Sequence, residues 1–163
     1  MLSSNQIGAV YMAISAVSFS IMDILVKIMS ASYPTGEIVF FRGLFGLIPI
    51  FFIIPRERYK NLFQTKKLKL HLARAFIGTF GMLWIFLAVK YLPIAEAITI
   101  TFAAPVFATI FSMIILKEVI KVFRWVAIII GLAGVVIILK PGTELFTIYS
   151  LFPLMFCLFF GII

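Results

Sequence analysis

Long apolar runs separated by short polar or charged clusters make up the whole chain. The predicted helical runs cover residues 7–27, 37–54, 74–90, 92–116 and 125–140, and a sixth apolar run covers residues 145–163. A helix of about 20 residues crosses about 30 Å of hydrocarbon. The third and fifth runs are short between their charges, so we expect Arg74, Lys90 and Lys140 to extend toward the membrane interface. The pattern predicts an all-α fold of serial membrane helices.

Composition excludes a water-soluble globular domain. Hydrophobic residues make up 64% of the chain and charged residues 12%, and the mean hydropathy is +1.22. Too few polar side chains remain to cover a protein of this length in water. The single cysteine, Cys157, lies in an apolar run and has no intrachain disulfide partner, so we interpret it as a packing residue.

The positive charges are distributed asymmetrically along the connections between the runs. Of the 14 Lys and Arg residues, seven lie between Arg56 and Arg74, and Lys117, Lys121 and Arg124 follow the fourth run. Cytoplasmic loops carry such an excess, which predicts a cytoplasmic N-terminus. This topology also explains the net charge of +8 without nucleic-acid binding. No basic residue precedes Lys27, which argues against a signal peptide.

Three charged residues inside the predicted spans are the first candidates for a functional site. Asp23, Arg42 and Glu96 all fall in the outer half of the membrane under this topology. Asp23 and Lys27 have the spacing of an ion pair within one helix, and Arg42 is a potential partner of Asp23 or of Glu96. Charges inside a membrane are costly unless they are paired or hydrated. Structural ion pairing and a substrate-binding or gating site both remain open.

Prolines inside the spans point to local breaks. Pro105 would leave the carbonyl group of Thr101 without its helical donor, and Thr99 and Thr101 are polar neighbours. The broken helix would line an aqueous cavity, or a neighbouring helix would satisfy a simple kink. Small residues at helical spacing predict packing seams between helices at Gly43 and Gly46, Gly78 and Gly81, and Gly131 and Gly134.

Other residues carry weaker signals. Tyr11, Trp84 and Tyr91 are candidates for stacking against a planar substrate, although in a chain with 16% aromatic residues a given ring more often faces lipid or the core. Glu118, among Lys117, Lys121 and Arg124, is predicted to hold the cytoplasmic turn after the fourth span. His71 is the only histidine, and we find no paired metal-ligand spacing and no phosphate-binding loop. We therefore predict neither enzymatic activity nor a cofactor.

The segment from Tyr91 to Gly142 resembles the EamA domain of the drug/metabolite transporter superfamily. The matching elements are the Tyr-Leu-Pro turn, Pro105, Leu116 and Glu118, Arg124 and Trp125, and the series Gly131, Gly134, Pro141 and Gly142. The segment FFRGLFGL around Arg42 is also similar to the second helix of that family. Span count and loop charge extend the resemblance over essentially the whole chain.

The resemblance implies two inverted five-helix repeats with a substrate pathway between them. Residues 1–142 would be one repeat, and residues 143–163 would be the first helix of a second repeat. We expect a missing second repeat or a partner chain to complete the site. The implied function is alternating-access transport of a small organic metabolite across a bacterial cytoplasmic membrane, with proton coupling through Asp23 or Glu96 as a hypothesis. A non-transporting membrane assembly protein is the alternative.

Overall fold

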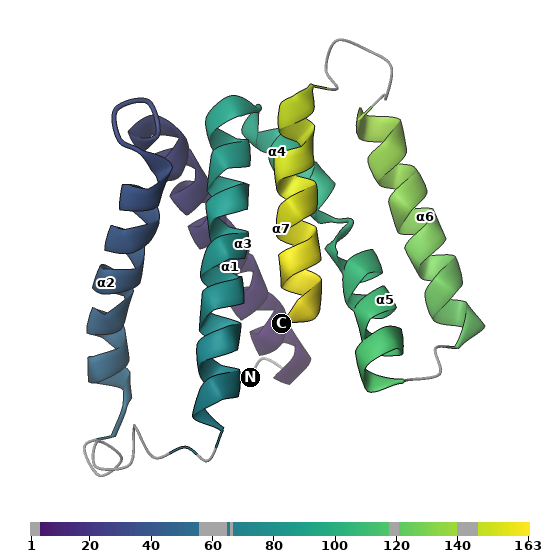
Figure 1. Cartoon of the computed structure of the whole chain (residues 1–163), viewed down its shortest axis with the longest axis horizontal. Helices are drawn as coiled ribbons and strands as arrows, with labels where there is room; N and C mark the ends of the chain where they lie inside the picture. Colours follow the sequence, from purple (N-terminus) through teal and green to yellow (C-terminus); the bar gives the residue numbers. More distant parts are fainter. Residues whose placement is uncertain (1–3, 56–64, 66, 118–120, 140–146) are drawn as a thin grey trace.

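The computed structural model describes residues 4–55, 65, 67–117, 121–139 and 147–163. Every regular element in these ranges is helical, as predicted. The elements, arranged as in Figure 1, are α1 (Ser4–Met29), α2 (Thr35–Ile53), α3 (Leu68–Tyr91), α4 (Ile94–Thr101), α5 (Ala104–Leu116), α6 (Val122–Leu139), the short 3-10 helix η2 (Ile148–Ser150) and α7 (Leu151–Ile162).

Four segments are long and apolar enough to cross a membrane. They are α1, α2, α3 and the 23-residue segment Ile94–Leu116, which contains both α4 and α5. The last two apolar runs form the shorter apolar helices at Trp125–Gly134 and Ile148–Ile162. The third helix starts earlier than predicted, at Leu68, because Lys69, His71 and Arg74 continue the helix beyond its apolar part. Lys and Arg are good helix formers, and their long side chains reach water from such a position.

The fourth predicted span is interrupted where the proline predicts it. The N–H groups of Phe102 and Ala103 donate to carbonyl groups three residues earlier, at 3.1 and 3.0 Å, which tightens the chain between α4 and α5. Pro105 lies in the first turn of α5 and cannot donate to the carbonyl group of Thr101. The break is confirmed, but the proline begins a new helix and does not lie in the middle of one.

The last helix, α7, packs between α3 and α5 (Figure 1). A Cβ atom built at Gly161 would lie 2.8 Å from the backbone of both Phe107 and Ala108 in α5. A Cβ atom at Gly81 would lie 3.2 Å from Phe159. The predicted small-residue seam on α3 is therefore filled by α7, whereas the closest backbone approach is at Gly161, which was not among the predicted seam residues.

The main buried core lies where the first four helices meet. It consists of Val26, Ile38, Val39, Phe86, Ala88, Val89, Leu92, Ala97 and Ile100. Only the last part of α1 contributes to it, because residues 5–21 are all exposed. Exposed apolar side chains of this kind suit contact with lipid or with a further membrane helix.

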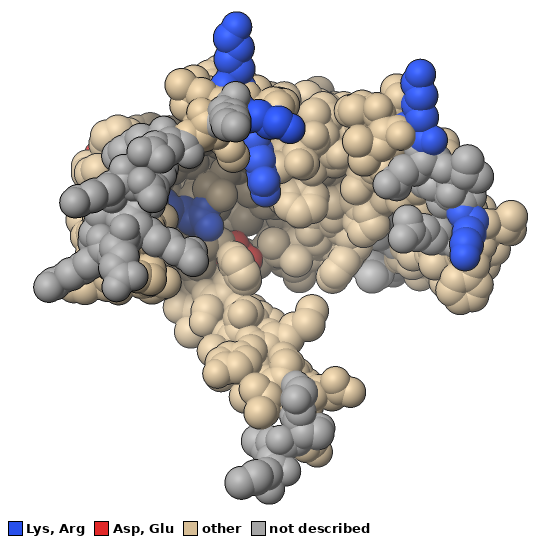
Figure 2. All heavy atoms as spheres, turned by 90° about the horizontal axis from the view of Figure 1, so that it is seen from below, with Lys and Arg blue, Asp and Glu red and all other residues tan. Residues whose placement is uncertain are grey.

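Basic residues gather at one end of the helix bundle. The N-terminus lies at the same end as the last turns of α2 and α5 and the first turns of α3 and α6 (Figure 1). Viewed from that end, described Lys and Arg side chains project from several places on the surface (Figure 2). The turns from α1 to α2 and from α3 to α4 lie at the opposite end.

Candidate functional site

Asp23 and Arg42 bring opposite charges together between α1 and α2. Their carboxylate and guanidinium groups attract each other electrostatically, and both residues are half-buried. Of the two partners predicted for Arg42, Asp23 is therefore the one whose charge acts on it, but the two side chains form no ion pair in the described structure. The Arg42 guanidinium also contacts the sulfur of Met82 and lies 5.6 Å from the ring centroid of Phe86, both on α3. Arg42 consequently joins α1, α2 and α3 through electrostatic and cation–π contacts.

A cavity of about 450 Å³ lies between α1 and α2, and Arg42 lines it, whereas Asp23 does not. Arg42 and Glu37 are its charged residues, and its remaining lining is apolar or aromatic: Met22, Leu25, Val26, Met29, Tyr33, Ile38, Phe41 and Phe45. The end view in Figure 2 shows a hollow with both a basic and an acidic region in its depth. Apolar walls with few polar groups are typical of small-molecule sites.

Lys27 does not form the predicted pair with Asp23 in the described part of the chain. Its Nζ atom donates instead to the backbone oxygen atoms of Lys90, at 3.0 Å, and of Leu92, at 2.8 Å. The last carbonyl groups of a helix have no partner within that helix, and a cation near them is favourable. Lys27 therefore fixes α1 to the turn between α3 and α4. Helical spacing indicates only partners within α1, so it could not reveal this contact.

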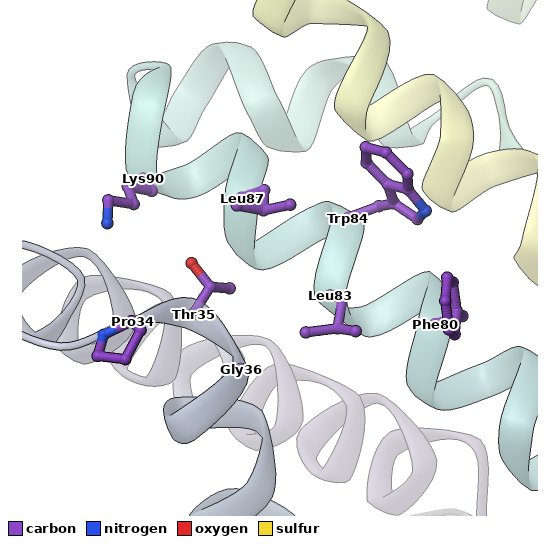
Figure 3. Close-up of a pocket in the computed structure, with 8 residues that line it drawn as sticks. All are labelled: Pro34, Thr35, Gly36, Phe80, Leu83, Trp84, Leu87 and Lys90. Carbon is purple, nitrogen blue, oxygen red and sulfur yellow. The ribbon is translucent and has the colours of Figure 1, made fainter.

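Two of the three candidate aromatic residues, Trp84 and Tyr91, lie in a cluster with η2 and α7, whereas Tyr11 is exposed on α1. The rings of Tyr91 and Tyr149 stack with centroids 4.6 Å apart. Phe152 lies 6.1 Å from Tyr91 and 5.5 Å from Trp84 by the same measure. Trp84 also lines a second cavity, between α2 and α3 (Figure 3). Tyr149 and Phe152 were not predicted, because aromatic residues are too frequent in this chain for one ring to be distinguished from the others.

Glu96 lies in the first turn of α4, where a carboxylate interacts favourably with the helix dipole. Its Oε1 atom is buried and has no hydrogen-bond partner among the described residues. The side-chain oxygens of Thr147 and Ser150, just before α7, share this property. Neither of these hydroxyl groups was predicted as a candidate. Buried polar atoms without a partner are uncommon and call for water or a ligand.

Thr101 and Pro105 do not line either of the two cavities. The Thr101 hydroxyl donates to the carbonyl group of Ile98 at 2.6 Å. The backbone oxygen atoms of Ile100 and Thr101 face the thiol of Cys157, at 3.6 and 3.7 Å. Cys157 is fully buried, so a neighbouring helix covers the break on this side. The alternative of a break satisfied by a neighbour therefore describes this face better than an aqueous cavity.

The remaining candidates add little chemistry. Glu118 lies outside the described residues. Lys117, directly before it, ends α5 in the left-handed conformation with φ of 54°, a common way for a helix to terminate. Within the described ranges, no group of three or more His, Cys, Asp or Glu residues is arranged to hold a metal ion.

Comparison with known proteins gives consistent matches to transporters. The profile of the EamA-like transporter family matches residues 6–140. The S-adenosylmethionine uptake transporter of Rickettsia prowazekii is 32% identical over 84% of this chain and 46% of its own length. The riboflavin transporter of Vibrio cholerae is 28% identical over 90% and 50%, respectively.

The pseudopaline exporter CntI of Pseudomonas aeruginosa is 27% identical over 93% of this chain and 53% of its own length. The chain thus spans about half the length of the curated relatives it matches. No solved structure matches it significantly.

Proposed function

The chain belongs to the EamA-like transporter family, and from this premise we propose that it forms half of a secondary transporter for a small organic metabolite. The observation that carries the proposal is Arg42, a half-buried cation that lines a cavity of about 450 Å³ between α1 and α2 and is attracted by the charge of Asp23. Charged side chains within membrane spans carry a high free-energy cost, so they usually mark a substrate or ion pathway.

The proposed architecture is one five-span repeat, residues 1–142, followed by the first helix of a second repeat, residues 143–163. In this scheme α4 and α5 form one span, and α6, with 18 residues, is long enough for about 27 Å. Two observations support it: the relatives are about twice as long, and the first part of α1 exposes an apolar surface. A second repeat or a partner chain would cover that surface and complete the pathway.

The proposed location is the bacterial cytoplasmic membrane, with the N-terminus in the cytoplasm. The gathering of basic side chains at the end that holds the N-terminus supports this orientation. Cysteines introduced at Asn5 and at Ser32, in a Cys157→Ala background, test it. An impermeant maleimide added to intact cells should label position 32 and not position 5. The reverse pattern would invert the topology.

In the proposed mechanism, α1 and α2 move relative to the rest of the repeat while Lys27 holds the outer end of α1 to α3. Asp23 and Arg42 separate or exchange partners as the cavity opens toward one side. Trp84 and Tyr91 provide aromatic surface for the substrate, the break at Thr101 and Pro105 provides bending, and Glu118 shapes the cytoplasmic turn. Proton coupling in this mechanism uses Asp23 or Glu96. The Oε1 atom of Glu96 is buried and has no hydrogen-bond partner among the described residues.

Transport measurements test the proposal directly. The named relatives carry S-adenosylmethionine, riboflavin and pseudopaline, so labelled forms of the first two are suitable initial probes in a wider metabolite panel. We expect saturable accumulation of at least one compound in vesicles that contain the chain together with the second repeat or the partner chain that completes its pathway. Arg42→Gln and Asp23→Asn should reduce it by about tenfold or more, in proportion to a lost charge contact of about 1.4 kcal/mol in the transition state.

Lys69→Gln is the matched control, because Lys69 is an exposed cation in the first turn of α3. It should leave transport unchanged. Accumulation equal to that of protein-free vesicles for the whole panel would contradict the transporter and favour a membrane assembly protein. Transport that is insensitive to a collapsed pH gradient would remove the proton-coupling step alone.

A further inference from the structure

A second cavity, of about 460 Å³, lies between the start of α2 and α3 (Figure 3). One wall is apolar, because four residues spaced at i, i+3, i+4 and i+7 share one face of α3: Phe80, Leu83, Trp84 and Leu87. Thr35, Gly36 and Lys90 line the cavity near the end of α3. The cavity therefore combines an elongated apolar surface with a polar end.

Thr35 contributes a nearly buried hydroxyl group to the polar end. The residue is only 8% exposed, and its hydroxyl forms no hydrogen bond with any residue that the structure describes. Thr79, Thr99 and Thr109, deeper in their helices, each donate to the carbonyl group four residues earlier, at 2.7 to 2.9 Å. Thr35 begins α2 and lacks such a carbonyl group. Figure 3 shows its oxygen directed into the space between α2 and α3.

The first backbone N–H groups of α2 are also available. Pro34 occupies the N-cap position without a side-chain hydrogen bond. The N–H groups of Glu37 and Ile38 donate to the Pro34 carbonyl at 3.0 and 3.4 Å, whereas those of Thr35 and Gly36 have no acceptor in the described structure. A Cβ atom at Gly36 would meet nothing within 4 Å, so the space in front of it is open. The N-terminus of a helix favours an anion.

Lys90 brings a positive charge to the same place. In Figure 3 its amine points toward the start of α2. The Nζ atom lies 5.9 Å from the ring centroid of Tyr91, and within the described ranges it forms no ion pair with a carboxylate. Lys27, by contrast, uses its ammonium group on two carbonyl oxygens. The polar end thus presents a cation, a hydroxyl and two N–H groups.

We propose that this cavity binds an anionic group, a carboxylate or a phosphate, that is attached to an apolar body. The anion would accept hydrogen bonds from Thr35 and from the start of α2 and pair with Lys90, which are strong charge-assisted contacts. The apolar body would lie along α3 beside Trp84. Glu37, which would repel an anion, lines the other cavity. A free amphiphilic acid and an anionic lipid head group share this chemistry.

Trp84 is a built-in reporter of occupancy, since it is one of two tryptophans and lines the cavity. A Trp125→Phe variant of the full chain in detergent leaves Trp84 as the only tryptophan. Octanoate should change its fluorescence saturably, whereas octanamide, which is neutral and of the same length, should bind at least tenfold more weakly. Equal responses to the two compounds would overturn the anion site.

Substitutions in the same background test the named contacts. Lys90→Gln should weaken octanoate binding about tenfold and Thr35→Val about fivefold, as expected for losing charged and neutral hydrogen bonds. Lys90→Arg should retain most of the affinity. Lys69→Gln and Thr79→Val are matched controls, because Lys69 is exposed and Thr79 is bonded within its own helix. Unchanged affinity in both Lys90→Gln and Thr35→Val would reject the proposal.

Nanodiscs distinguish the two sources of the anion. Brominated phosphatidylglycerol should quench Trp84 more than brominated phosphatidylcholine if a lipid head group occupies the site, and Lys90→Gln should remove the difference. Equal quenching by both lipids, together with octanoate binding, assigns the site to a free acid. No response to any of these anions overturns the proposal. Each measurement reads binding, so a failure of transport would leave it intact.

Discussion

The two sides of the molecule differ in how closely their helices pack. On the closed side, formed by α3, α4, α5 and α7, Pro153 and Cys157 are fully buried and Gly161 brings two backbones together. On the open side, formed by α1 and α2, residues 5–21 are exposed. Both cavities, of about 450 and 460 Å³, have a wall on α1 or α2.

This difference distinguishes a closely packed group of helices from the two helices that carry Asp23, Arg42 and Thr35. Asp23 and Arg42 lie on the open side, and so does Thr35, whose hydroxyl faces a cavity. Charged and polar groups are tolerated in a membrane protein where water, a ligand or another charge can reach them. The seam between α3, α5 and α7 is closely packed, so it supplies a rigid surface against which α1 and α2 can move.

The largest effect on stability should come from placing a side chain at Gly161, where the backbones of α7 and α5 lie closest together. Gly161→Leu forces α7 away from Phe107 and Ala108, since even a Cβ atom would lie 2.8 Å from their backbone. Overpacking of this kind costs about 3 kcal/mol. Gly131→Leu on α6 is the control, because nothing lies within 4 Å of a Cβ atom there. Unfolding by dodecyl sulfate in mixed micelles measures the unfolding free energy of both variants. Equal loss in the two variants would contradict the closed seam.

The same valine substitution on each side sharpens the comparison. Val89 is fully buried in the main core, whereas Val17 on α1 is 60% exposed. Val89→Ala should lose about 2 kcal/mol of unfolding free energy through lost contacts and a residual cavity. Val17→Ala should stay within about 0.5 kcal/mol of the parent, as is usual for exposed positions. A large loss at Val17 would mean that α1 is packed along its whole length.

Sequence reasoning predicts the individual helices better than their contacts. The apolar runs predict α1 and α2 because hydropathy directly reports the length of chain that avoids water. Pro105 predicts the break between α4 and α5, because a missing N–H group acts locally. The position of α7 between α3 and α5 could not be predicted, since the hydropathy of an apolar run does not indicate which other helix it packs against.

The candidate site shows the same limit. Helical spacing suggested Lys27 as the partner of Asp23, but the ammonium group reaches a turn more than 60 residues away in sequence. Spacing within one helix cannot indicate such a contact. Thr35 and Ser150 were overlooked because a single hydroxyl is ordinary in sequence. Only burial without a hydrogen-bond partner makes it informative.

Removing the Lys27 ammonium tests the link between the two sides. Lys27→Met keeps the apolar stem but leaves the backbone oxygens of Lys90 and Leu92 without this donor. The expected loss is about 1.5 kcal/mol, the lower range for hydrogen bonds to a charged group. Lys69→Met, which removes an exposed cation from α3, should cause no measurable loss. A smaller effect at Lys27 than at Lys69 would show that the helix-terminal contact contributes nothing.

The smallest effect should be the coupling between Asp23 and Arg42, measured with Asp23→Asn, Arg42→Gln and the double variant. Both residues are half-buried and Arg42 lines a cavity, so water screens their attraction, and we expect a coupling free energy of about 1 kcal/mol or less. Salt should reduce it further, because ions reach exposed pairs. A coupling of about 3 kcal/mol that salt does not change would mean a dry pair. In that case α1 and α2 would pack as closely as the helices of the closed side, and the proposal that they move relative to α3, α4, α5 and α7 would be wrong. A weak, salt-sensitive coupling combined with a large loss of transport would instead show that the pair is kept for function, since its contribution to stability is small.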